Sequence, residues 1–110
     1  MSKSKQKGTA AETAVVRWLQ EQGLKHVERR SLNGVNDRGD IAGIPGVVIE
    51  VKNHARMALP EWLAELEVEM RNDKADTGVV IHKRKGTTNV GEWYATMPVA
   101  VWFALLKVGE

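Results

Sequence analysis

"GDIAGIPGVVIEVKNH", from Gly39 to His54, is the stretch of sequence that decides the fold. Its Pro45-Gly46 pair is typical of a tight turn, and the segments on either side are apolar, so the stretch predicts two strands joined as a hairpin. The second strand, "VVIEVK", is almost continuously apolar, which favours a central place in a sheet that is covered on both faces. A carboxylate inside such a strand costs stability unless something compensates it. The position of Glu50 therefore predicts either a side chain or ion that compensates its carboxylate or a functional role for it.

Asp40, Glu50 and Lys52 bring three charges to this hairpin. Glu50 and Lys52 are two residues apart, so their side chains lie on the same face of the strand. The hairpin would bring Asp40 close to Glu50, and two close carboxylates repel unless a cation lies between them or one takes up a proton. Oxygen ligands suit Mg²⁺ or Mn²⁺, which can polarise a phosphate, while Lys52 can stabilise the charge of a transition state. The alternative is an ion pair, Glu50 with Lys52 or Asp40 with Arg38.

The rest of the sequence predicts helices and strands around this hairpin. Helical spacing of apolar residues predicts a helix after Thr9 and another from Pro60, and Pro98 opens a third, "PVAVWFALLKV", which is apolar nearly all round. Further strands are predicted over 25–31, 78–83 and 90–97. The order α-β-β-β-α-β-β-α predicts one α/β domain over residues 8–110, a central mixed sheet flanked by helices, after a flexible basic tail over residues 1–7. The last helix is expected to be fully buried or to form a homodimer.

The composition is that of an ordinary globular domain, with 110 residues, of which 43% are hydrophobic and 27% charged. The lack of cysteine excludes disulfides and cysteine zinc sites and favours the cytoplasm. The first ten residues have no apolar core of a secretory signal, and no apolar run reaches the roughly 20 residues of a membrane helix, so we expect no membrane partner. The net charge of +2 is uneven, because residues 60–76 carry six acids and two bases. The basic remainder suits a polyanion, and the glutamates of the second helix are expected largely outside its apolar face.

Asp40, a gap of nine residues and then "EVK" resembles the motif of the PD-(D/E)XK nuclease superfamily, with "GD" in place of "PD". "KGTAAE", Lys7 to Glu12, resembles a first-helix motif of the archaeal-type Holliday junction resolvases and related phage enzymes. The resemblance implies a restriction-endonuclease-like core and cleavage of branched DNA by a symmetric homodimer. It implies Mg²⁺, with Mn²⁺ as a substitute, and no small-molecule cofactor. Asp40 and Glu50 match the metal-binding residues, and Lys52 matches the catalytic lysine.

Glu12 has two possible roles. It matches a glutamate that reaches towards the metal in this family, which makes it a third candidate ligand and a candidate catalytic residue. It also completes "TAAE", a capping box in which Thr9 and Glu12 bond to the first amides of a helix. The sequence leaves both roles open.

Basic residues surround these acids in the sequence and are candidates to contact DNA phosphates. They flank the loop before Asp40, follow Lys52 and crowd a turn near Gly86. Ser31 resembles a serine in the DNA-contacting loop of related resolvases, and His54 is either a phosphate contact or an exposed polar residue. The candidate DNA contacts are Lys7, Arg29, Arg30, Ser31, Arg38, His54, Arg56, Lys83, Arg84 and Lys85.

Together these patterns predict an endonuclease that resolves four-way junctions by paired symmetric cuts. One alternative is a flap or other structure-selective nuclease of the same superfamily in repair or replication. The other is a non-catalytic DNA-binding module on the same fold. The three charged residues of the hairpin count against this last class, because phosphate binding alone needs no carboxylates beside the phosphate.

Overall fold

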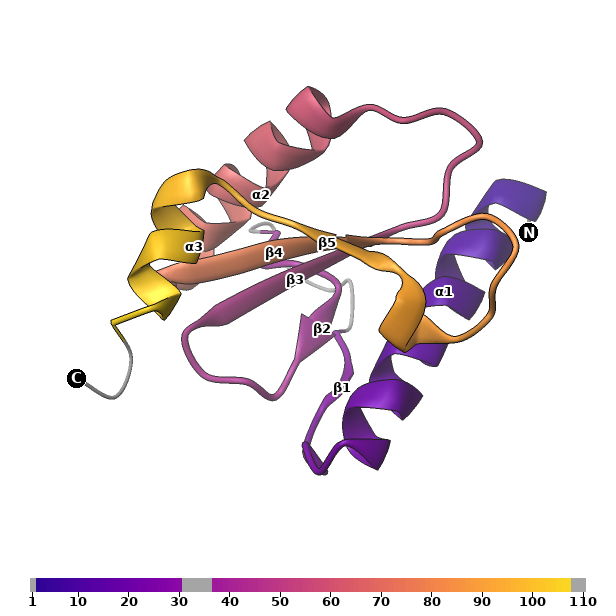
Figure 1. Cartoon of the computed structure of the whole chain (residues 1–110), viewed down its shortest axis with the longest axis horizontal. Helices are drawn as coiled ribbons and strands as arrows, with labels where there is room; N and C mark the ends of the chain where they lie inside the picture. The colour runs from indigo at the N-terminus through magenta and orange to yellow at the C-terminus, as the bar shows by residue number, and fades with distance from the viewer. Residues whose placement is uncertain (1, 31–36, 108–110) are drawn as a thin grey trace.

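The computed structural model of this chain describes residues 2–30 and 37–107. Its mixed sheet has the strand order β1-β2-β3-β4-β5, formed by β1 (Glu28–Arg29), β2 (Ile41–Ala42), β3 (Val47–Lys52), β4 (Thr77–His82) and β5 (Tyr94–Thr96). The helices of the described residues are α1 (Lys3–Glu21), α2 (Leu59–Asp73), α3 (Val99–Leu105) and a short 3-10 helix, η1 (Val90–Glu92). The predicted order of elements and the α/β class are confirmed, with η1 as an addition (Figure 1).

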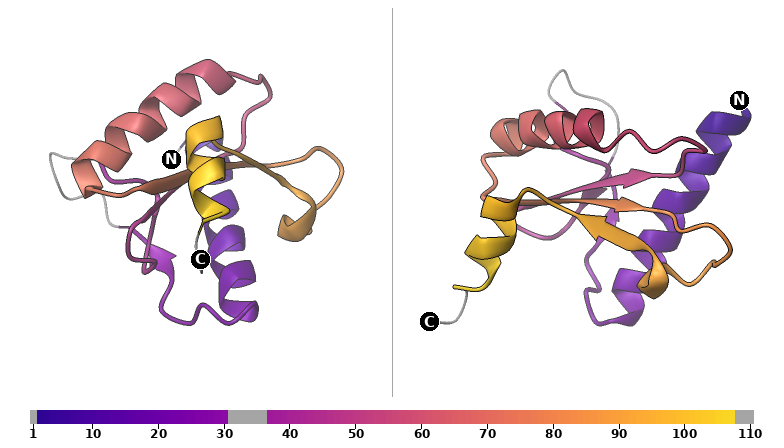
Figure 2. Two further views of the ribbon diagram at one scale, coloured as in Figure 1. Left: turned by 60° about the vertical axis from the view of Figure 1, so that its left-hand side comes forward. Right: turned by 45° about the horizontal axis from the view of Figure 1, so that its top comes forward.

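The sheet is covered by helices on both faces, with α2 on one side and α1 on the other (Figure 2). In its centre β3 and β4 run parallel, whereas the other neighbouring strands pair antiparallel. Alternate residues of β3 enter two separate cores. Ile49 and Val51 pack with the α1 side, and Val48 packs with Leu66 on the α2 side. The prediction that "VVIEVK" is a central strand covered on both faces is therefore confirmed.

The predicted hairpin forms, and it fixes the backbone of Asp40. Ile41 of β2 lies opposite Ile49 of β3, and the connection between the strands turns through positive φ angles at Gly43 and Gly46. Just before β2 the Asp40 amide donates to the Ile49 carbonyl over 2.9 Å. The Asp40 carbonyl accepts from the Arg30 amide over 2.8 Å. Asp40 is thus held by main-chain bonds on both sides at the point where β2 begins.

The N-terminal segment differs from the prediction. Helix α1 begins at Lys3 and not after Thr9, so the expected flexible tail over residues 1–7 is wrong for the part that the structure describes. Ser2 caps the helix, since its hydroxyl accepts from the Lys5 amide over 3.2 Å, and lysine and glutamine are good helix formers. The capping box of Thr9 and Glu12 is also wrong, because both residues already lie inside the helix.

The edge elements are shorter than predicted. Over residues 25–30, the described part of the strand expected over 25–31, the strand is reduced to β1, and the strand expected over 90–97 becomes η1 followed by β5. Asn89 explains the second difference, because its side-chain oxygen accepts from the Gly91 amide over 3.0 Å and starts the 3-10 turn. Within residues 2–30 and 37–107, none of the helices has the length and apolarity needed to cross a membrane.

Helix α3 is apolar but mostly uncovered in the single chain. Val101 is buried, whereas Trp102 is 52% exposed, Phe103 51% and Leu106 56%. Full burial of the last helix within one chain, the first of the two expectations, is therefore wrong. Its apolar face is exposed in the part of the chain that the structure describes.

Two glycines of the hairpin give a matched test of how this fold is built. A Cβ atom at Gly43 would lie 2.4 Å from the His26 carbonyl oxygen, whereas one at Gly46 would meet nothing within 4 Å, and both glycines have positive φ. Gly46→Ala should cost about 1–2 kcal/mol of unfolding free energy from backbone strain alone. Gly43→Ala should cost at least about 3 kcal/mol, because overpacking adds to the strain. Urea unfolding measures both, and equal losses would contradict the close packing of the hairpin on the chain around His26.

Candidate active site

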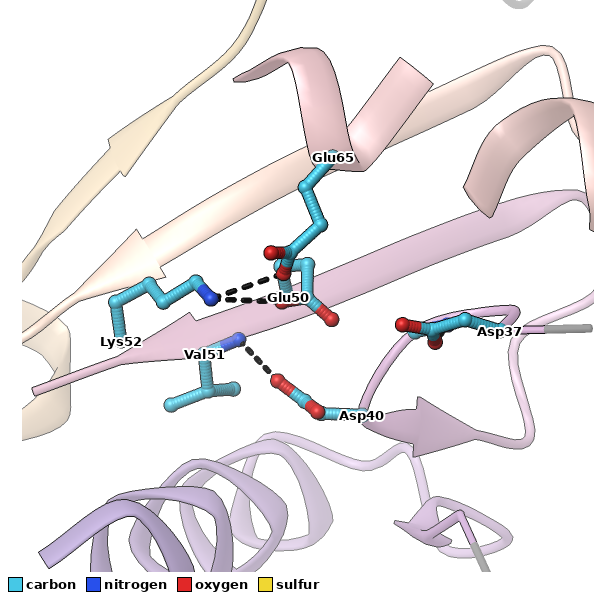
Figure 3. A network of polar contacts seen from close by, with 7 residues as sticks. Asp37, Asp40, Glu50, Val51, Lys52 and Glu65 are labelled. Carbon is cyan, nitrogen blue, oxygen red and sulfur yellow. Dashed lines mark hydrogen bonds and ion pairs between the residues drawn. The ribbon is translucent and has the colours of Figure 1, made fainter. Parts of the chain in front are cut away.

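A pocket of about 430 Å³ at the end of β3 gathers charged side chains from separate elements. Asp40, Glu50 and Lys52 all line it, so the structure brings the three predicted residues of the hairpin together (Figure 3). Glu12 reaches it from α1, Glu65 reaches it from α2, and Asp37 lies just before β2. The pocket therefore holds five carboxylates and two lysines, Lys7 and Lys52, among its lining residues.

Strand geometry explains how the hairpin residues meet. Glu50 and Lys52 lie on the same face of β3, as predicted, and their side chains make an ion pair of 3.3 Å between Nζ and Oε2. Asp40 reaches β3 from β2, and its Oδ2 atom accepts from the Val51 amide over 2.8 Å. The backbone pairing of β2 with β3 is confined to Ile41 and Ile49. Beyond this pair, the Asp40 side chain continues the contact with β3 through its hydrogen bond from the Val51 amide.

Lys52 has more anionic partners than it can neutralise. Its Nζ atom lies 2.9 Å from Oε1 of Glu65 as well as close to Glu50. The ion pair of Glu50 with Lys52, one of the two alternatives considered from sequence, is thus present as part of a larger cluster. The other is not formed, because Arg38 pairs with Asp73 at 3.6 Å.

A hydrogen bond between Glu50 and Glu65 shifts the pKa values of the two glutamates in opposite directions. Burial, the hydrogen bond with Glu65 and the charge of Asp40 raise the pKa of Glu50 far above its usual range. That same hydrogen bond lowers the pKa of Glu65. Burial acts to lower the pKa of Lys52, but the hydrogen bond to Glu65 and the two glutamate charges raise it overall. These shifts favour the protonated form of Glu50 and the charged forms of Glu65 and Lys52.

Asp40 and Glu12 line the same pocket and are close enough for the charge of Glu12 to act on Asp40. Burial raises the pKa of Asp40 to about 6, the Val51 hydrogen bond opposes this, and the charge of Glu12 adds to it. Glu12 itself pairs with Arg29, whose Nε and Nη2 atoms each lie 3.0 Å from Oε1. Glu12 is therefore placed at the pocket but is held by an arginine on β1.

Asp37, Glu65 and Glu69 are site residues that sequence reasoning missed. The expectation that the α2 glutamates lie largely outside the apolar face is wrong for Glu69, which is 0% exposed. Glu69 follows Leu66 by three residues and Trp62 by seven, so it lies on the helix stripe that faces the sheet. That spacing was the available signal for Glu69. Asp37 had no comparable signal beyond its nearness to Asp40.

The donor set suits a hard divalent cation. Carboxylate oxygens are the ligands that Mg²⁺ and Mn²⁺ prefer, and both oxygens of Glu69 are buried without a hydrogen-bond partner. In the described part of the chain, one group of three acids brings its oxygens within 4.8 Å of one another, namely Asp37, Glu50 and Glu69. The predicted ligand set of Glu12, Asp40 and Glu50 lines the same pocket but is not such a group. Glu50 is common to both sets.

Half of the predicted DNA contacts line a second pocket of about 670 Å³. It shares a wall with the acidic pocket, because Lys7, Lys52 and His54 line both. The turn after β4 adds three further basic residues, Lys83, Arg84 and Lys85. Tyr94 is half-exposed in this pocket, and the Arg84 guanidinium lies 5.9 Å from the centre of its ring. We call this second pocket the basic groove.

The remaining predicted DNA contacts lie elsewhere. Arg29 and Arg38 are engaged in ion pairs with acids, and Arg56 is exposed in the loop between β3 and α2. The Nε atom of Arg30 is buried without a hydrogen-bond partner. Ser31 lies outside the described residues.

The raised pKa values predict that the metal-free protein loses stability as the pH rises. The pKa is about 6 for Asp40 and, through burial, about 8 for Glu69, both above the ordinary carboxyl range. The folded state therefore binds more protons than the unfolded state between about pH 4 and pH 8, and the stability present at low pH disappears as these groups ionise. In chelator, the unfolding free energy should fall over this range.

Glu69→Gln should flatten that pH dependence, because glutamine keeps the shape of the protonated acid and does not ionise. Glu67→Gln, on the exposed side of the same helix, is the matched control and should follow the native protein. Urea unfolding at a series of pH values measures the slopes. An equally steep fall in Glu69→Gln would contradict the assignment of Glu69 as a buried group that must ionise.

In comparisons with known proteins, the chain matches no protein-family profile, no curated protein and no solved structure. The residues of the pocket and the groove, together with the sequence resemblance of "GD" and "EVK" to the PD-(D/E)XK motif, are therefore the basis for inferring a function. What this chain shares with that motif is one aspartate, one glutamate and one lysine, gathered at the end of a central strand.

Proposed function

We propose that this protein is a divalent-metal-dependent endonuclease with a restriction-endonuclease-like core that cuts branched DNA, with the four-way junction as its substrate. The observation that carries the proposal is the convergence of Asp40, Glu50 and Lys52 in one acidic pocket that opens beside a basic groove. A purely structural cluster of charges needs no groove of lysine and arginine at its edge. A nuclease needs both, because it must hold a polyanion against its reacting groups.

Asp40 and Glu50 are the proposed ligands of the catalytic cation, and Glu12 lines the same pocket. When bound there, Mg²⁺ or Mn²⁺ supplies Lewis-acid polarisation of the phosphodiester. The Asp40 side chain is oriented by the Val51 amide, and its backbone is fixed by Ile49 and Arg30. Such double anchoring holds the carboxylate in one position, which catalysis by positioning requires.

Lys52 supplies the positive charge at the reacting phosphate. Its ammonium is held by Glu50 and Glu65 and faces the same pocket. Extra negative charge develops on the phosphate oxygens as the bond to the nucleophile forms, and a preorganised cation there lowers the barrier. Glu65 acts as a positioning residue, because its contact with Lys52 keeps the ammonium beside Glu50.

The basic groove gives the path of the DNA backbone. Lys83, Arg84 and Lys85 follow β4 directly, and Lys7 projects from α1 beside the acidic pocket. These residues attract phosphates irrespective of base sequence, which suits an enzyme that recognises the shape of a branch. The resemblance of "KGTAAE" to the junction resolvases favours the four-way junction over a flap.

A symmetric homodimer completes the proposal, since resolution of a junction requires two cuts. Helix α3 offers Val99, Trp102, Phe103 and Leu106 as an exposed apolar face. Exposed apolar residues that cluster on one element are typical of a contact surface, and an isologous pairing through α3 would cover them.

The catalytic prediction uses Asp40→Asn on a fixed four-way junction, a flap and a linear duplex, with Mg²⁺ or with chelator. The native protein should nick the junction in symmetric pairs with Mg²⁺ only. Asp40→Asn should cut at least about 100-fold more slowly, which corresponds to about 2.7 kcal/mol of transition-state stabilisation. Its junction affinity should be unchanged or slightly higher, because one negative charge is removed.

Lys83→Ala with Lys85→Ala is the matched control, because it removes two charges of the basic groove and leaves the acidic pocket intact. It should bind the junction more weakly, with a shallower salt dependence, yet cut what it binds at the native rate. Cleavage of the flap alone would favour the alternative substrate. If no substrate is cut with any divalent metal, while the junction is bound, the protein is a DNA-binding module.

The dimer prediction uses Trp102→Ala together with Phe103→Ala. Loss of both rings should shift the protein from dimer to monomer in sedimentation velocity, because the two exposed aromatic side chains of the apolar face of α3 are removed. Leu24→Ala, an exposed apolar residue in the turn after α1, is the control and should keep the native mass. A native protein that sediments as a monomer would rule out α3 as a self-association surface.

A further inference from the structure

Glu69 is a buried carboxyl group whose environment demands a cation or a proton. It is 0% exposed, and neither of its oxygens has a hydrogen-bond partner. Its polar neighbours, Asp37 and Glu50, are carboxyl groups as well, so only a proton shared with them or a cation can satisfy its oxygens. An ionised carboxylate in such a place costs several kcal/mol, because it has lost its hydration without gaining a donor.

The spacing of these three acids fits a single ion. Each residue offers one oxygen, and all three oxygens lie within 4.8 Å of one another. Two oxygens that bind the same Mn²⁺, Mg²⁺ or Ca²⁺ at about 2.0–2.6 Å are at most about 5 Å apart. The bound of 4.8 Å fits oxygens around one Ca²⁺ ion as they stand, whereas Mg²⁺, at about 2.1 Å from each ligand, needs them to approach to about 4.2 Å.

Two of the three ligands are already fixed in place by other contacts. The Asp37 side chain accepts from the Gly39 amide over 2.9 Å, and its carbonyl accepts from the Asn72 side chain of α2 over 2.7 Å. Glu50 is held on its other side, where Oε2 faces Lys52. Asp37 is exposed and lines the acidic pocket, so an ion can enter past it. Glu69, which is 0% exposed, lies behind Asp37 and has no direct access to solvent.

We propose that Asp37, Glu50 and Glu69 form a second divalent-cation site, behind the site assigned to Asp40 and Glu50. The ion would join three separate elements, since Asp37 precedes β2, Glu50 lies on β3 and Glu69 on α2. Glu50 lies between the two sites and contributes to both. The inner site stabilises the attachment of α2 to the sheet. It exists in the folded protein without DNA and is independent of the proposed nuclease activity.

The test is Mn²⁺ binding to the full-length protein without DNA, measured by titration calorimetry and by electron paramagnetic resonance of free Mn²⁺. The native protein should bind two ions per chain. Glu69→Gln keeps the size of the side chain and removes its charge, so it should lose one ion or bind it at least about tenfold more weakly. Asp40→Asn should keep the ion that Glu69→Gln loses, and Glu67→Gln should bind like the native protein.

Thermal unfolding checks that Glu69→Gln is folded. It also shows whether Glu69 of the native protein binds a cation or only holds a proton. In chelator at pH 8, Glu69→Gln should have a higher melting temperature than the native protein, because the buried charge of Glu69 is removed. Added Mn²⁺ should raise the melting temperature of the native protein more than that of Glu69→Gln, since an ion that binds only the folded state stabilises it. If Glu69→Gln binds Mn²⁺ with native stoichiometry and affinity, Glu69 merely holds a proton and the inner site does not exist. Absence of DNA cleavage would leave these results unaffected.

Discussion

Lys52 faces Glu50 and Glu65 at the end of β3, and this single ammonium group has more carboxylates around it than it can neutralise. Asp37 and Asp40 line the same pocket, and Glu69 lies buried behind it. Such a cluster is unstable by itself, because buried carboxylates repel one another and lose their hydration. The two apolar cores on either side of β3 hold it together. Under the proposed function, a divalent cation would offset this charge and leave every carboxylate ionised.

The separation of charge within the molecule connects cation binding with DNA binding. Acids form the acidic pocket, bases line the adjoining basic groove, and Lys7, Lys52 and His54 line both. A phosphate drawn in by the groove would be repelled by the carboxylates at its end if these remained uncompensated. A bound metal ion would replace this repulsion with attraction, because its positive charge acts on the phosphate. The proposed metal dependence and the proposed polyanion binding thus follow from one principle, in which the acidic α2 has a role beside the sheet.

The sequence predicts those features of the fold and the site that depend on residues close together in the chain. The apolar run of "VVIEVK" and the Pro45-Gly46 turn were sufficient for the hairpin, and a spacing of two was sufficient to place Glu50 beside Lys52. Glu65 and Glu69 approach Glu50 from a different element, so their contacts depend on how α2 packs on the sheet, which no local pattern contains. The start of α1 was missed because a lysine-rich segment resembles a mobile tail as much as a helix. The exposure of α3 depends on whether the rest of the chain covers it.

An anomalous-scattering map from crystals grown with Mn²⁺ tests the central claim most directly, because it locates the ions without reference to activity. The account predicts one manganese peak between Asp40 and Glu50 and a second among Asp37, Glu50 and Glu69. It also predicts that Lys52 keeps its contact with Glu65 beside the first peak. A pocket without manganese at saturating Mn²⁺, with its carboxylates paired through shared protons, would contradict both the metal-dependent site and the chemistry inferred from it.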